Sequence, residues 1–140
     1  MKKLILITIW LSVCIYSFNQ EIGLGVNHTF GRTDGYGVTV KVDKYYASFD
    51  KGRYILPTEQ HTNINQFGLY RQVYQYNSCK TLIGLTYNDF YNTNLSKKPH
   101  KISGIFAFNY EPKTVGIALF FDPFNWEGKL SIIINFNKHK

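Results

Sequence analysis

The chain has few charged residues and almost no cysteine. Charged residues make up 18% of the sequence and aromatic residues 17%, whereas about a quarter of the residues in a typical soluble domain are charged. The two cysteines are Cys14 and Cys79, and Cys14 falls in an apolar run at the N-terminus. If that run is removed on export, Cys79 has no partner, so we expect no intrachain disulfide.

The sequence also lacks the short motifs that carry most enzymatic chemistry. It contains no glycine-rich phosphate loop, no Cys-x-x-Cys pair and no nucleophile elbow. The histidines His28, His61, His100 and His139 are not spaced as a local metal pair. His28 is the candidate for a catalytic base, but no partner serine can be named, and an interfacial histidine is the simpler interpretation. We therefore expect no enzymatic activity, no catalytic residue, no cofactor and no metal.

The basic residues do not form a nucleic-acid-binding pattern. The formal net charge is +7, but lysines and arginines are scattered through the expected turns. They are not clustered with aromatic residues on one element, so we expect no nucleic-acid partner.

The N-terminus has the pattern of a signal peptide. Two lysines precede an apolar run over residues 4–18, which is shorter than the roughly 20 residues that a transmembrane helix needs. We expect residues 1–19 to be the signal peptide and residues 20–140 to form one exported domain. A retained N-terminal anchor and a lipid attached at Cys14 are the alternatives.

The remainder of the chain alternates between bulky apolar residues and small or polar ones. Val115, Ile117, Leu119 and Phe121, for example, alternate with small residues and Phe120. Because successive side chains of a strand point to opposite faces, such a pattern predicts a strand. The same pattern recurs, with one parity slip, over residues 22–31, 38–49, 63–76, 80–91, 102–110 and 130–137.

The stretch between the second strand and residue 57 is the least certain, and one segment in it leaves the strand count between seven and eight. The apolar parity slips near Asp43, which we interpret as a β-bulge within one long strand. Residues 50–52 then form the next turn, and Arg53–Leu56 is a short strand if the count is eight. The connections are too short for parallel crossovers. We expect an all-β fold: an antiparallel up-and-down meander that closes into a small barrel of about eight strands.

The composition of the two strand faces favours a membrane barrel. The face opposite the bulky residues is mostly Gly, Ala, Ser, Thr and Asn, which suits a narrow lumen. Most charges fall at expected turns, including Asp50, Lys80, Glu111, Asp122, Glu127 and Lys129. Aromatic residues near strand ends suit an interfacial girdle: Tyr36, Tyr54, Tyr76, Tyr91, Tyr110 and Trp126.

This alternation over Glu21–Phe136 resembles that of the small outer-membrane β-barrel proteins of Gram-negative, Bacteroidetes-like bacteria. The resemblance implies a monomeric barrel in outer-membrane lipid, with no open pore and a structural or surface-interaction role. It also implies short periplasmic turns and longer outer loops. The basic 92–101 loop is then either simply solvated or a contact for lipopolysaccharide.

A soluble barrel is the alternative interpretation of the same alternation. In a periplasmic or secreted lipocalin-like protein the bulky face would line an internal cavity for an apolar ligand. Phe106, Ile117 and Ile132 would then point inward rather than outward. The two hypotheses therefore differ in which face of the sheet is inside.

Overall fold

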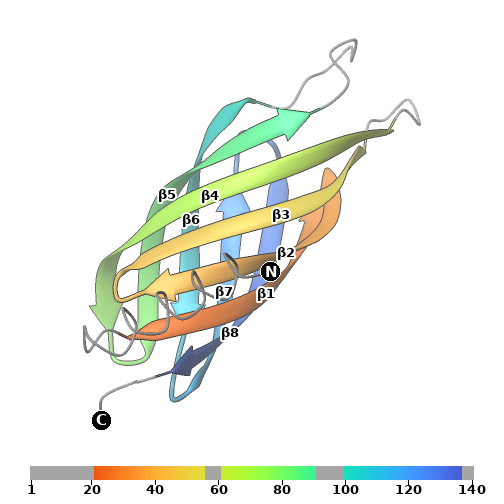
Figure 1. Ribbon diagram of the computed structural model, residues 1–140. Coiled ribbons are helices and arrows are strands. Elements are labelled where there is room, and N and C mark those ends of the chain that lie inside the picture. The colour runs from red at the N-terminus through yellow and green to blue at the C-terminus, as the bar shows by residue number, and fades with distance from the viewer. Residues whose placement is uncertain (1–20, 56–60, 91–99, 137–140) are drawn as a thin grey trace, which may run out of the picture.

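Eight antiparallel strands form a closed barrel in the computed structural model, which describes residues 21–55, 61–90 and 100–136 (Figure 1). Each strand pairs with its neighbours in the chain, and β1 pairs with β8 to close the sheet. The strands are β1 Ile22–Gly31, β2 Thr33–Val42, β3 Tyr45–Ile55, β4 His61–Tyr76, β5 Cys79–Phe90, β6 Ile102–Tyr110, β7 Val115–Asp122 and β8 Glu127–Phe136. The predicted fold class and the count of eight are confirmed.

The two ends of the barrel differ in their connections. At one end, called the turn end, the connections are residues 43–44, 77–78 and 111–114. At the other, called the loop end, two of the four connections are longer than any of these: residues 56–60 and 91–101. The other two are residues 123–126, which match 111–114 in length, and Arg32 alone. The first and last parts of the described chain both lie at the turn end, since Glu21 bonds to Asp43 and Asn135 bonds to Thr114. The two longest connections lie at one end, as predicted, but the short turn predicted at residues 50–52 is replaced by one at residues 43–44.

The predicted division between the second and third strands is wrong. Asp43 and Lys44 form a two-residue hairpin turn, and Asp43 has a φ of 52°. Residues 50–52 lie inside β3, where they pair with both β2 and β4. A bulge and a two-residue turn produce the same parity slip, because both residues flanking such a turn face the same side of the sheet. The only register shift that the described strands show lies in β4, between Gln72 and Tyr74.

The bulky face of the sheet points outward. Phe106, Ile117 and Ile132 are 41%, 51% and 46% exposed, and they belong to an outer band to which every strand contributes. We call this band the apolar belt, and it includes Leu24, Val26, Val38, Val40, Phe49, Phe67, Leu69, Ile83, Leu85, Ile102, Phe106, Phe108, Ile117, Leu119, Leu130, Ile132 and Ile134. The opposite face is buried in the lumen, and besides small and polar residues it carries a few large ones such as Tyr46, Leu82 and Phe120.

The expected aromatic residues divide into three groups. Tyr36, Tyr76, Tyr110 and Trp126 are exposed near strand ends, as predicted. Tyr54 is buried, because it faces the lumen with Ile64, so its assignment to the outer girdle is wrong. Tyr91 lies outside the described residues, as do residues 1–19, including Cys14, and most of the 92–101 loop.

Candidate functional site

Charged and polar side chains fill the lumen in two clusters. The turn-side cluster consists of Glu21, Lys41, Tyr46, Lys80, Asn109, Glu111 and Asn135. The loop-side cluster consists of Asn27, Thr39, Ser48, Asp50, Tyr70 and Lys129. Each cluster joins strands that are far apart around the barrel.

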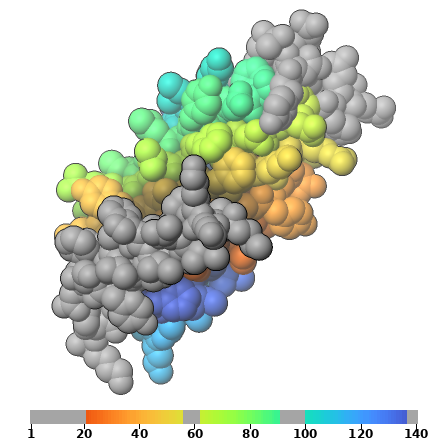
Figure 2. Space-filling view, viewed as in Figure 1, coloured from red at the N-terminus to blue at the C-terminus, as the bar shows by residue number. Residues whose placement is uncertain are grey.

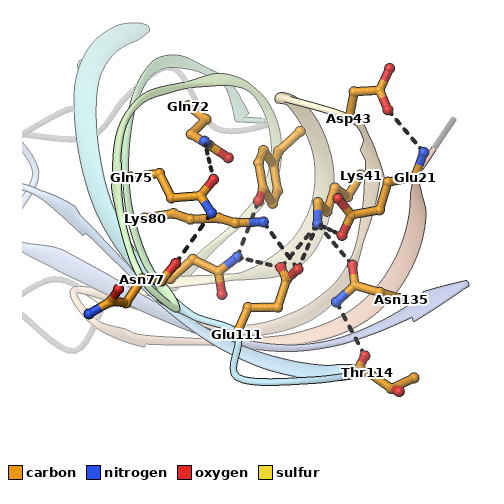
Figure 3. A network of polar contacts seen from close by, with 12 residues as sticks. Glu21, Lys41, Asp43, Gln72, Gln75, Asn77, Lys80, Glu111, Thr114 and Asn135 are labelled. Atoms are coloured by element: carbon orange, nitrogen blue, oxygen red, sulfur yellow. Dashed lines mark hydrogen bonds and ion pairs between the residues drawn. The ribbon is translucent and has the colours of Figure 1, made fainter. Parts of the chain in front are cut away.

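Lys41 is the centre of the turn-side cluster (Figure 3). Its ammonium nitrogen lies 2.6 Å from Glu21 Oε1, 3.0 Å from each carboxylate oxygen of Glu111 and 3.0 Å from Asn135 Oδ1. The side chains of Lys41 and Glu111 are both 0% exposed. A buried charge is tolerated only when it is paired and hydrogen-bonded, and this geometry supplies both conditions.

Lys80 and Asn109 complete the surroundings of Glu111. Lys80 Nζ lies 3.1 Å from Glu111 Oε1, and Asn109 Nδ2 donates to Oε2 at 3.1 Å and to the Tyr46 hydroxyl at 3.1 Å. Burial by itself would raise the pKa of the Glu111 carboxyl. The hydrogen bond and positive charge of Lys41, together with the charge of Lys80, outweigh burial and lower that pKa from 4.5 to about 2. Two lysines and two glutamates thus balance their charges within this cluster.

Lys129 organises the loop-side cluster. Its ammonium donates to Ser48 Oγ at 2.7 Å, to Asp50 Oδ2 at 2.9 Å and to the Tyr70 hydroxyl at 2.9 Å. The same nitrogen lies 4.8 Å from the centre of the Phe120 ring, a distance suited to a cation–π contact. Asp50 Oδ1 in turn accepts a hydrogen bond from Asn27 Nδ2 at 2.7 Å.

The contact between Ser48 and Lys129 has the composition of a Ser–Lys nucleophilic pair but not its electrostatics. A lysine activates a serine only as a neutral amine that can accept a proton. The Lys129 ammonium directs its three donors to Ser48, Asp50 and Tyr70, and the Asp50 carboxylate balances its charge. This arrangement favours the protonated lysine, so the contact holds the barrel together and does not activate the serine.

Asp122 and Asn125 organise the connection between β7 and β8. Asp122 Oδ1 accepts hydrogen bonds from the backbone N–H groups of Phe124 and Asn125, and its Oδ2 accepts one from Ser103 Oγ at 2.6 Å. Asn125 Oδ1 accepts a bond from the backbone N–H of His100 at 2.8 Å. The start of β6 and the β7–β8 connection are thereby fixed to each other.

The histidines do not assemble a reactive site in the described residues. His28 faces outward, and its ring centre lies 4.9 Å from that of Tyr36. His100 is exposed beside Phe124, with ring centres 6.1 Å apart. The side chain of His61 and the whole of His139 lie outside the described part of the chain. Within that part, no group of three histidine, cysteine or acidic residues is placed to hold a metal ion.

Sequence reasoning missed the buried charges of the lumen. Asp50, Lys80, Glu111, Asp122, Glu127 and Lys129 were expected at exposed turns, and Lys41 was not singled out. All seven are buried. The alternation along the strands could have placed two of these lysines in the lumen. Lys41 lies on the same inward face as Thr39, and Lys129 lies on the same inward face as Ser131.

Among the residues that the structure describes, no helix is long and apolar enough to cross a membrane. Comparison of the chain with protein families, with curated proteins and with solved structures gave no significant match.

Proposed function

We propose that this chain is an exported, non-enzymatic outer-membrane β-barrel with a structural or surface-interaction role. The observation that carries the proposal is the apolar belt on the outside of a barrel whose inside is polar. Leu69, Val26 and Phe108 are 71%, 65% and 61% exposed. Apolar residues lie beside them on the neighbouring strands, for example Val38 and Ile132 beside Val26 and Leu119 beside Phe108. Large contiguous apolar surfaces are rare on soluble monomers and mark contact with lipid or protein. A transmembrane barrel has this inverted pattern.

The filled lumen supports a role without an open pore. Inward side chains from all eight strands converge, and the turn-side cluster closes its end with the ion pairs of Lys41, Lys80 and Glu111. Barrels of about eight strands have interiors just wide enough to be filled by side chains. The closed sheet also leaves no free edge strand, which supports a monomer.

The two ends of the barrel support an orientation in the membrane. Transmembrane barrels have short periplasmic turns and longer outer loops, so we place the turn end in the periplasm. His100 and Lys101, at the end of the 91–101 connection, are exposed at the opposite end. A contact between this basic connection and lipopolysaccharide is part of the proposal.

The lipocalin-like alternative has less support from the side-chain directions. An internal site for an apolar ligand requires bulky apolar residues around a cavity, and Phe106, Ile117 and Ile132 face outward instead. The largest fully buried side chains mix aromatic and apolar residues such as Tyr46, Tyr54 and Phe120 with polar and charged ones such as Lys41, Glu111 and Asn88. Such a lumen suits internal polar pairing better than an apolar ligand.

Fractionation and heat-modifiability test the proposal directly. We expect the expressed chain to sediment with outer membranes, to resist a high-salt or carbonate wash, and to need detergent for extraction. Unheated in SDS, the folded barrel should migrate faster than the boiled chain, because a closed barrel resists SDS at room temperature. A folded, monomeric protein that is soluble in buffer without detergent would overturn the membrane proposal and restore the soluble alternative.

A further inference from the structure

An apolar groove runs along the outer surface of the barrel across β3, β4, β5 and β6. The backbone of Tyr70 and Gly84, which pair across β4 and β5, forms part of its floor. Its walls are outward-facing side chains, among them Tyr45, Leu69, Arg71, Ile83 and Leu85. Figure 2 shows the side of the molecule on which β3, β4 and β5 lie, coloured yellow to green.

One positive charge lies at the turn-side part of this groove. Arg71 is exposed and pairs across the sheet with Tyr45, the first residue after the Asp43–Lys44 turn. Its guanidinium carbon lies 5.8 Å from the centre of the Tyr45 ring, a cation–π distance that holds the head of the side chain beside the groove. In the described part of the chain, no carboxylate forms an ion pair with Arg71.

The position of Arg71 is unusual among outward-facing charges. In the described strands, the other charged residues on the outer face lie near the loop end: Asp34, Lys51, Arg53 and Asp89. Arg71 instead follows Leu69 and precedes Val73, both of which are exposed apolar residues. A lone arginine inside the turn-side part of an apolar surface is costly unless its head reaches the interface or an anionic partner.

We propose that this groove binds a phospholipid with an anionic headgroup, whose phosphate contacts Arg71 and whose acyl chain lies along Leu69, Ile83 and Leu85. The proposal rests on the membrane function proposed above and adds a defined lipid site on the turn-end side. A guanidinium can form two parallel hydrogen bonds to a phosphate, and the groove supplies apolar walls for a chain. A free phosphate would contact only Arg71, and a lipid without a phosphate would contact only the apolar walls of the groove.

Lipid titration of the folded protein, followed by native mass spectrometry, tests the site. The barrel in non-ionic detergent micelles is titrated with phosphatidylglycerol or with a diacylglycerol, which has the same acyl chains and no phosphate. We expect phosphatidylglycerol to bind about fivefold more tightly, the factor that one basic residue contributes near an anionic surface. Glycerol phosphate without acyl chains should show no measurable binding, because it lacks the part that enters the groove.

A matched pair of arginine variants localises the effect. Arg71→Gln should remove the preference for phosphatidylglycerol, whereas Arg53→Gln, on the same outer face near the loop end, should retain it. Heat-modifiability in SDS confirms that both variants are folded. An unchanged preference in Arg71→Gln, or no preference in the unaltered protein, would overturn the lipid site. Equal binding of glycerol phosphate would also overturn it, since the site would then be one for free anions.

Failure of this proposal can be told apart from failure of the membrane proposal. A chain that folds in buffer without micelles contradicts both. A chain that needs micelles, shifts on heating in SDS and shows no lipid preference contradicts the groove site alone.

Discussion

Lys41 and Glu111 lie 70 positions apart in the chain, yet the Lys41 ammonium is 3.0 Å from both oxygens of the Glu111 carboxylate inside the barrel. The contact joins β2 to the β6–β7 turn across the lumen. Both side chains are fully buried, so each charge depends on the other for its stabilisation.

A double-mutant cycle should measure this dependence. Glu111→Leu leaves Lys41 and Lys80 without their shared anion, and we expect a loss of about 3–5 kcal/mol in the free energy of unfolding. Lys41→Met should cost less, because Lys80 still pairs with Glu111. The double variant should be about 1–3 kcal/mol more stable than the sum of the two changes predicts. Urea titration in detergent micelles gives these values, and simple additivity would contradict a direct pair.

The depressed pKa of Glu111 predicts an acid-sensitive barrel. The folded pKa is about 2, below the ordinary value of 4.5, so the folded state holds this carboxylate ionised more strongly than the unfolded state does. The resulting stability is present above pH 4.5 and is lost as the pH falls toward 2. The free energy of unfolding should therefore decrease over this window.

Glu111→Gln is the control for this pH dependence. Glutamine cannot ionise, so the free energy of unfolding of this variant should lack the part of the acid-induced decrease that comes from Glu111. The difference between the unaltered protein and this variant should narrow as the pH falls from 4.5 to 2. A constant difference across that range would show that Glu111 does not have a depressed pKa.

The cost of an arginine substitution along β8 should depend on how deeply the substituted position lies in the membrane. Ile132 faces outward between the neighbouring outward residues Leu130 and Ile134. If lipid surrounds the belt, Ile132→Arg should cost about 2–4 kcal/mol of folding free energy in lipid vesicles. Arginine at Leu130 or Phe136, nearer the strand ends, should cost less, because the penalty falls toward the interfaces. A profile without a maximum at the middle positions would contradict a membrane-spanning strand.

An inward residue on the same strand provides the control for this series. Ser131 is buried, and its hydroxyl has no hydrogen-bond partner among the described residues. Ser131→Ala removes a buried polar group that gains nothing from the protein, so it should be neutral or stabilising by up to about 1 kcal/mol. A large loss of stability would indicate that the lumen around Ser131 is arranged differently.

Two glycines on opposite faces of the sheet should respond differently to alanine. A Cβ atom at Gly68 would overlap the hydroxyl of Tyr70 and come within 2.7 Å of Ser48 Oγ, so Gly68→Ala should disturb the loop-side cluster and cost about 1–3 kcal/mol. A Cβ atom at Gly104 would meet only Phe124, at 3.6 Å. Gly104→Ala should be neutral or stabilising by up to about 1 kcal/mol, because alanine lowers the entropy of the unfolded chain. Equal costs in urea titration would contradict the packing of Tyr70 over Gly68.

The fold was predictable because a strand has a side-chain period of two, and the outer row of β7 and the inner row of β8 follow this period without interruption. The turn at Asp43 was not predictable, because its two residues shift the parity of the apolar face just as a bulge would. The Asp-Lys sequence also lacks the glycine that usually marks a tight hairpin.

The partners of the buried charges were less accessible to sequence reasoning. Parity places Lys41 and Lys129 on the inner face, but Lys41 meets Glu111 only because the sheet curves into a barrel. The distance between Lys41 and Glu111 across the lumen depends on strand tilt and barrel closure, and the alternation of residues along a strand carries no information about either.

The partners of Lys41 also constrain the order in which the molecule can assemble. They come from Glu21 before β1, from Glu111 between β6 and β7, and from Asn135 near the end of β8. The full set of contacts therefore exists only after the last strand has joined the first. Until that step Lys41 lacks some of its partners, so its ammonium group must remain hydrated in an incompletely formed sheet. Closure and dehydration of this one ammonium group become a single late event, which disfavours persistent open intermediates.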